Sequence, residues 1–256
     1  MSTNISKTDL ETIFNNLKKE FSEKGYSQST LDNFVRFNVK GAELPYELKP
    51  LENYSWDEIA NIIEKGFADY YFKDGDTKSA TLYTGEEIVC RVIGINHDIL
   101  AKTRGKQSVT FMFFIDGEFE MNELNTNIGG WTDSKMRTKY MQRFYKLLPE
   151  DLQRVIKTVV KFTSQGNKSS VICETEDKLF IPSAVEVSGE CEYSADGEGK
   201  QYSFFKNGGK LPEKWFWLRS PYLSSSYNFC YWYNYGCVSN ISASSAYYCP
   251  LCFCIG

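Results

Sequence analysis

Apolar side chains recur at helical spacing in two stretches near the start of the chain. Residues 8–24 predict an amphipathic helix, because five apolar residues fall on one of its faces: Leu10, Ile13, Phe14, Leu17 and Phe21. A second helix is expected from Trp56 to about Lys65, where Ser55 and Glu58 have the spacing of a capping box. The segment between them contains Gly41, Pro45 and Pro50, which predict a linker or an extended arm.

From residue 79 onward, β-type patterns dominate. Residues 79–95 predict a hairpin that turns at Thr84-Gly85, and residues 108–115 predict a buried strand. A helix is expected from about Ser134, with a shorter one from Pro149. Further strands are predicted in segments that are rich in β-branched and aromatic residues: 155–162, 178–187, 202–205 and 215–220. The fold class is therefore α+β, with early helices and a β-rich C-terminal half.

The last part of the chain differs in charge from the rest. The 256 residues carry 29 basic and 33 acidic side chains, but none of the 37 residues after Arg219 is charged. Tyr222–Gly256 contains seven tyrosines, seven serines and three asparagines. The serines and asparagines are atypical of a core, and the aromatic residues are atypical of disorder. Tyrosine with serine, glycine and asparagine is the composition of antibody-like contact surfaces. The tail therefore predicts a binding face.

Bulk composition excludes several classes of partner. The net charge of −4 predicts no nucleic-acid binding, since such proteins need basic surfaces. No window approaches 18 apolar residues, so membrane insertion is not expected. The N-terminus lacks the apolar segment of a secretory signal, which predicts synthesis in the cytoplasm. A role outside the cell then needs another exit, such as release within a virus particle.

The common motifs of hydrolases, nucleotide-binding proteins and zinc proteases are missing, so no catalytic residue is predicted. His97 beside Asp98 could act as a general base, but a structural role is favoured. Gly129-Gly130-Trp131 predicts a tight turn with a buried aromatic residue, and Arg137 could pair with a core carboxylate. The C-x2-C of "CPLCFC" is insufficient for a zinc site, and no metal or cofactor is predicted.

The residue types of the tail also fit one pattern of mutation. An AAC codon that changes only at its two adenines can yield Tyr, Ser, Cys, Phe, Ile, Leu, Ala, Asp and Gly, but never Lys, Glu, Gln, Met or Trp. Between Tyr222 and Cys249, only Trp232 falls outside the reachable set. Adenine-directed mutagenesis would leave residues of this kind.

The chain resembles a family of phage and prophage proteins of gut Firmicutes. The resemblance runs from Tyr54 to Gly256 and includes the motifs "IGINHDIL", "GGWTDSKMR", "EDKLFIPSAVEV" and "WFWLRSP". It implies a C-type lectin fold in the formylglycine-generating-enzyme-like variant, over residues 54–256, preceded by a helix and arm over 1–53. Many such proteins are variable proteins of diversity-generating retroelements. Their variable region would correspond to about 222–249 here.

The resemblance also divides the tail into framework and contact positions. Trp217–Pro221, Phe229, Cys230, Gly236, Val238 and Ala243 match the framework. Trp232 is also predicted to be a contact residue, because tryptophan is a frequent anchor of binding surfaces. The predicted contact set is Tyr222, Ser224, Ser225, Tyr227, Asn228, Tyr231, Trp232, Tyr233, Asn234, Tyr235, Cys237, Ser239, Asn240, Ile241, Ser242, Ser244, Ser245 and Tyr247. Where the family has G-V-R-P, this chain has Tyr247–Pro250, which leaves Tyr248 and Cys249 unassigned.

The expected function is therefore recognition of a receptor on a target surface. The partner could be a protein or a glycan, since aromatic side chains serve both as protein anchors and as sugar platforms. Two alternatives remain open. The tail cysteines could serve a thiol oxidoreductase like the formylglycine-generating enzymes, or the tail could be an interface between copies of the chain.

Overall fold

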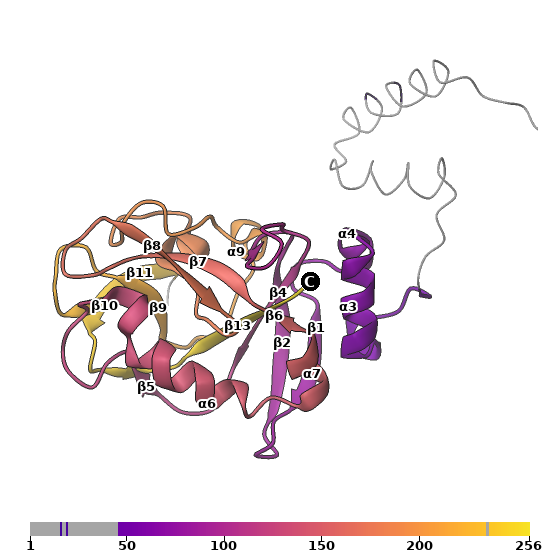
Figure 1. Cartoon of the computed structure of the whole chain (residues 1–256), viewed down its shortest axis with the longest axis horizontal. Coiled ribbons are helices and arrows are strands. Elements are labelled where there is room, and N and C mark those ends of the chain that lie inside the picture. The colour runs from indigo at the N-terminus through magenta and orange to yellow at the C-terminus, as the bar shows by residue number, and fades with distance from the viewer. Residues whose placement is uncertain (1–15, 17–18, 20–45, 234–235) are drawn as a thin grey trace, which may run out of the picture.

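The structure is a computed structural model that describes residues 16, 19, 46–233 and 236–256. The helix expected over 8–24 and most of the arm therefore lie outside the described residues. The described chain is a mixed α+β fold with mostly antiparallel sheets and short helices (Figure 1). Among the described residues, no helix is both long and apolar enough to cross a bilayer.

The first described elements are the short helix η2 (Leu51–Asn53) and the helices α3 (Trp56–Glu64) and α4 (Ala68–Tyr71). The predicted capping box at the start of α3 is confirmed, because Glu58 N donates to Ser55 Oγ and Ser55 N donates to the Glu58 carboxylate. The Trp56 ring meets Phe111 and Phe253 edge to face, which fixes α3 against the largest sheet.

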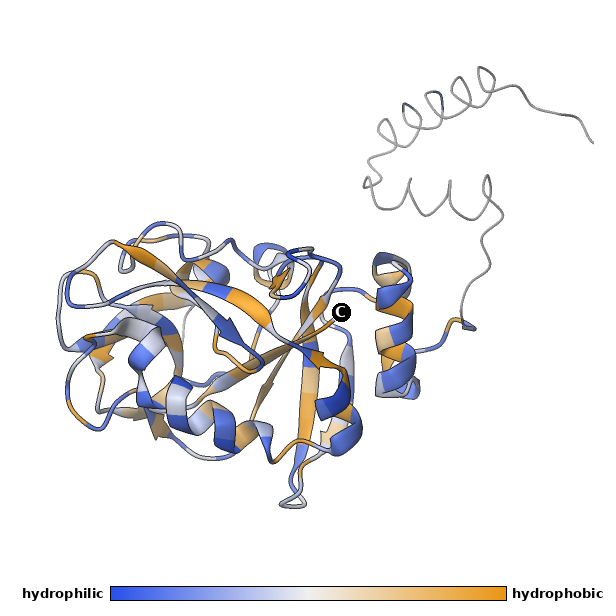
Figure 2. Ribbon diagram, viewed as in Figure 1, coloured by the Kyte–Doolittle hydropathy of each residue, from blue (hydrophilic) through white to orange (hydrophobic). Residues whose placement is uncertain are grey.

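That sheet has the strand order β1-β2-β4-β13-β6, with every pair antiparallel. Its strands are β1 (Thr77–Thr81), β2 (Glu87–Ile95), β4 (Val109–Phe114), β13 (Pro250–Ile255) and β6 (Ile156–Lys157). The last strand of the chain, β13, is fully buried between β4 and β6. Apolar residues follow these central strands in Figure 2, while the outer helices carry both apolar and hydrophilic residues. The tail is thus anchored in the core at its end.

Smaller sheets complete the body. The order β11-β10-β9 joins β9 (Phe216–Pro221), β10 (Asn228–Tyr233) and β11 (Cys237–Ser242). The order β3-β7-β8 joins β3 (Ile99–Leu100), β7 (Val159–Ser164) and β8 (Ile172–Asp177). A short pair joins β5 (Phe119–Glu120) and β12 (Ala246–Tyr247). Figure 1 shows β9, β10 and β11 at the end of the body opposite α3 and α4.

The expected helix after Ser134 consists of a π-helical segment η3 (Met136–Tyr140) followed by α6 (Met141–Tyr145), and the shorter one is α7 (Glu150–Val155). A short helix α5 (Gly130–Asp133) precedes them, and its Trp131 is fully buried, as the Gly-Gly-Trp motif predicts. Gly130 has φ +56°, and a Cβ there would lie 2.1 Å from Ser164 O, so only glycine fits. Arg137 pairs with the buried Asp177 at 2.6 Å, which confirms the predicted core pair.

Two predicted strands are wrong. Residues 178–187 form only an isolated bridge at Phe180 and then the helix α8 (Ala184–Ser188), because Ser183 and Glu186 make a second capping box. In the segment 202–205, Tyr202 is the N-cap of the helix α9 (Ser203–Lys206) and the other three residues belong to it. Short apolar runs of this kind fit a strand or a buried helical turn equally well.

Candidate ligand-binding face

The framework strand β9 is fixed by a buried arginine. The Arg219 guanidinium is completely buried and holds both oxygens of Glu186, at 2.5 and 3.0 Å. Its remaining donors bond to the carbonyl oxygens of Ile181, Phe162 and Glu198. The planar fork of arginine satisfies several acceptors at once, which a lysine could not do. Arg219 therefore joins β9 to α8 and β7, beneath the tail.

A second buried cation lies beside the first. The Lys161 ammonium bonds to Asp98 Oδ1 and Glu186 Oε1, both at 2.6 Å, and to the Tyr202 hydroxyl at 3.2 Å. Burial alone would raise the pKa of Asp98, but the charges of Lys161 and His97 outweigh it and hold that pKa well below its usual range. Asp98 and Glu186 are thus ionised and paired with buried cations, which is a structural arrangement.

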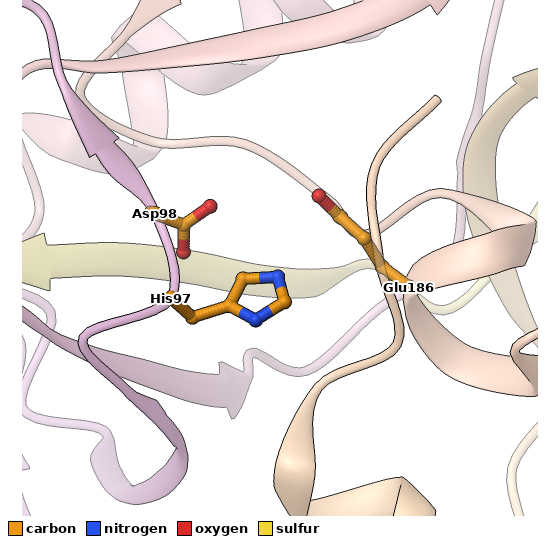
Figure 3. Close-up of side chains that lie close together, drawn as sticks. All are labelled: His97, Asp98 and Glu186. Carbon is orange, nitrogen blue, oxygen red and sulfur yellow. The ribbon is translucent and has the colours of Figure 1, made fainter. Parts of the chain in front are cut away.

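Figure 3 shows His97, Asp98 and Glu186 facing one another, and their potential ligand atoms lie within 4.8 Å. The Lys161 ammonium already bridges the two carboxylates, so a cationic group fills the place a metal would take. The His97 ring packs against Tyr202 with 4.1 Å between the ring centres and an angle of 33°, and burial lowers the pKa of His97. Asp98 also accepts from Thr110 and Tyr202, so it is committed to the buried network rather than to a general base.

The loop between β9 and β10 is held through its backbone. The buried side chain of Asn127 donates to Ser225 O at 2.8 Å and to Asn228 O at 2.7 Å, while Asn127 N donates to Ser226 O. Asn127 Oδ1 accepts from the Asn167 N–H at 2.8 Å. Because these bonds end on carbonyl groups, they do not depend on which side chains the loop carries.

The predicted contact residues and framework residues differ in burial. None of the contact residues that the structure describes is buried; Asn234 and Tyr235 lie outside the described residues. Of the framework positions, Trp217–Pro221, Phe229, Cys230 and Ala243 are buried. Gly236 is exposed and Val238 is half-buried, because both belong to the end of the β10–β11 hairpin. The structure thus brings most of the contact set onto accessible strands and loops.

The contact residues of the β10–β11 hairpin lie on two faces rather than one. β10 and β11 are antiparallel partners, so successive side chains alternate across the sheet. Tyr231 packs toward the main core, whereas Trp232 packs with Phe216 and Cys230 against α8. The sequence pattern could not show this division, because it gives residue types and not the position of covering elements.

Four aromatic rings gather on the Tyr231 face, and we call them the aromatic cluster: Trp215, Tyr231, Tyr233 and Tyr247. The Tyr231 and Tyr247 rings stack with centres 5.2 Å apart and an angle of 14°. Trp215 contacts all three tyrosines at 5.9 to 6.5 Å and keeps 43% of its surface exposed. Exposed aromatic groups of this kind are typical anchors of binding surfaces.

Sequence reasoning did not select Trp215 or Asn127. Trp215 precedes the recognised Trp-Leu-Arg-Ser-Pro motif, and its type alone is consistent with a buried strand residue. Asn127 lies almost a hundred residues before the loop that it holds. No local signal connects the two, since only the tertiary fold brings them together.

Three of the tail cysteines are placed in the core. Cys249, Cys252 and Cys254 are fully buried, and burial raises the pKa of each thiol. A reactive thiol needs the opposite shift. In the described part of the chain, the group of side chains that converges as potential metal ligands contains no cysteine. Cys191 and Cys237 are exposed.

A family model of a domain of unknown function, DUF6273, matches residues 99–256, and the chain belongs to this family. The match includes the buried Arg219, the Asn127 bonds and the whole candidate face. No curated protein and no solved structure matches the chain.

Proposed function

We propose that this protein recognises a ligand through its C-terminal face and that this face is diversified by adenine-directed mutagenesis. In this proposal the chain is a variable protein of a diversity-generating retroelement, and its fold is the formylglycine-generating-enzyme-like variant of the C-type lectin fold. Its place would be on a virus particle or another surface that must recognise a target. Binding, rather than catalysis, is the activity.

The observation that carries the proposal is the division of the tail by burial. None of the described contact residues is buried, four being exposed and twelve half-buried, whereas eight of the ten predicted framework residues are buried. A diversified surface needs this division, because substitutions at buried positions typically cost several kcal/mol and substitutions at exposed ones cost about 0.5 kcal/mol or less. A tail used as ordinary core would lack it.

Backbone anchoring supports the same proposal. Asn127 holds the 222–228 loop by carbonyl groups, and Asn122 N donates to Ala243 O in the next loop. Some polar contact residues bond to one another instead, as Asn228 does with Asn240 at 2.7 Å. Changes in these side chains would therefore leave the course of the loops largely intact.

The chemistry of the surface suits binding to varied targets. Rigid tyrosine and tryptophan rings bury a large area and lose few torsions, and serine and asparagine adapt their hydrogen bonds. The lack of charge after Arg219 lowers the cost of removing water from the face.

Deep sequencing of the codons for residues 217–256 in the source population tests the proposal. We expect substitutions at the predicted contact positions, with Trp217–Pro221, Phe229, Cys230 and Ala243 constant, and with changes restricted to adenines of a nearby template copy. A uniform tail, or substitutions spread equally over buried positions, would contradict it. Mass measurement of tail variants in solution checks the alternative, since loss of a multimer would indicate an interface between copies.

A further inference from the structure

A cleft of about 530 Å³ lies on the Trp232 side of the β10–β11 hairpin. Its walls come from the hairpin, from α8 and α9, and from the 188–193 segment. We call it the acidic cleft, after the residues that determine its chemistry: Glu190, Glu192, Tyr193, Phe205 and Trp232. This volume is in the range of small-molecule and side-chain pockets.

The charges around the acidic cleft have one sign. Glu190 and Glu192 are exposed, and no lysine, arginine or histidine lines the cleft. Within the described ranges, neither carboxylate forms an ion pair with a basic side chain. Two negative charges are thus available to a ligand, because no cation among the described residues lines the cleft or pairs with them.

A neighbouring cleft, which shares Phe205, Gly209, Trp232, Tyr233 and Gly236 with the acidic cleft, has other charges. It has about 410 Å³ and is lined by Lys210, Glu213 and Lys214, so it holds both signs of charge. The Lys214 ammonium lies over the Tyr248 ring, 4.2 Å from its centre. This chain therefore already places one ammonium on an aromatic ring near the hairpin, and the acidic cleft offers the same kind of surface without its own cation.

The walls of the acidic cleft are aromatic. The Trp232 ring stacks on Phe216, which fixes the indole. Tyr193 packs against the same small hydrophobic cluster, which consists of Ala184, Val187, Phe216, Leu218 and Cys230. A guanidinium or ammonium group gains from the face of such rings, and it gains more where carboxylates lie at the same site. The two carboxylates would repel an anionic ligand, and a purely apolar ligand would make no contact with their charge.

We propose that the acidic cleft binds an arginine or lysine side chain presented by a protein partner. The proposal rests on the proposed function, since Trp232, Tyr233 and Cys237 of the contact set line the cleft. Glu190 and Glu192 lie outside the variable region, so the preference for a cation stays the same while the hairpin changes. Of a protein and a glycan partner, this chemistry favours the protein.

The test uses the full chain labelled with ¹⁵N at tryptophan, titrated with a blocked Gly-Arg-Gly peptide. The reference probe is the same peptide with citrulline, which has nearly the same shape and no charge. We expect the Trp232 indole signal to shift and the arginine peptide to bind roughly tenfold more tightly than the citrulline peptide. Glu190→Gln with Glu192→Gln should remove most of this difference, while Glu213→Gln in the neighbouring cleft should leave it.

Equal affinity for the two peptides would overturn the proposal, and so would an equal effect of Glu213→Gln, which would indicate only a general effect of charge. Shifts at Trp215 without shifts at Trp232 would also overturn it. The proposed function is tested separately, because a uniform tail in the codon sequencing would contradict it whatever the peptides do. A diversified tail with no arginine preference contradicts the cleft alone.

Discussion

The side-chain amide of Asn127 donates a hydrogen bond to the carbonyl oxygen of Asn228, 2.7 Å away. Asn228 is a predicted contact residue, but the bond uses its backbone and leaves its side chain free to change. The same amide donates to Ser225 O, so one buried residue fixes both the middle and the end of the loop. In this loop, the backbone atoms therefore contribute to stability, and the side chains can contribute to binding specificity.

Asn127→Ala should destabilise the protein by about 2–4 kcal/mol, because it removes the hydrogen bonds to Ser225 O and Asn228 O and the acceptor of the Asn167 N–H. Chemical denaturation measures this loss. The matched control is Ser224→Ala in the exposed part of the same loop, which should change the free energy of unfolding by no more than about 0.5 kcal/mol. Equal effects of the two changes would show that the loop is not held through Asn127.

Phe229→Ala and Tyr227→Ala should separate framework from contact positions within one strand region. Phe229 is fully buried, so its loss should cost about 3–5 kcal/mol. Tyr227 keeps 59% of its surface exposed, and its loss should be nearly neutral for folding. Thermal and denaturant unfolding of both variants checks the contrast. A Tyr227→Ala protein that unfolds as easily as Phe229→Ala would place the tyrosine in the core.

Glu198 should make stability fall as the pH rises. Burial raises its pKa above the usual 4.5, although Ser220, Ser164, Arg219 and Thr163 act to lower it. The folded protein therefore holds this proton more tightly than the unfolded chain. The stabilisation that comes from this proton is fully present below the pKa of Glu198 in the unfolded chain. It is lost as the pH rises through the pKa of Glu198 in the folded protein.

Denaturant unfolding from pH 4 to 8 measures this contribution as the difference between the natural protein and Glu198→Gln. Asp98 and Glu186 have lowered pKa values and cause the opposite pH trend. Both proteins contain these residues, so their effect cancels in the difference. We expect the natural protein to lose stability relative to the variant as the pH rises. A difference that is flat, or that grows in favour of the natural protein, would contradict the raised pKa.

Thiol labelling of the native protein should be fast only at Cys191 and Cys237, which are exposed, and slower at the half-buried Cys173. Burial raises the pKa of Cys90, Cys230, Cys249, Cys252 and Cys254, so these should react only after unfolding. Mass spectrometry after timed labelling identifies the sites, and the denatured protein gives the total of eight. Fast reaction at Cys249 or Cys252 would restore weight to the thiol oxidoreductase alternative.

Several elements follow from sequence alone because their signals are local. The capping box at Ser55, the turn at Gly129–Gly130 and the apolar pattern of residues 108–115 each specify an element through neighbouring residues. The same signals fail for residues 178–187 and 202–205, where short apolar runs fit more than one state. The predicted pair of Arg137 with a core acid was correct, but only the fold identifies the acid as Asp177.

By itself, the sequence determined that the tail is uncharged and rich in tyrosine and serine, and it predicted an α+β chain with early helices and a β-rich C-terminal half. These are properties of composition and local spacing. Only the tertiary structure decided which tail residues are accessible, that Tyr231 and Trp232 face opposite ways, and that Asn127 and Trp215 belong to the face. Burial and contact depend on residues far apart in the chain, which local patterns do not record.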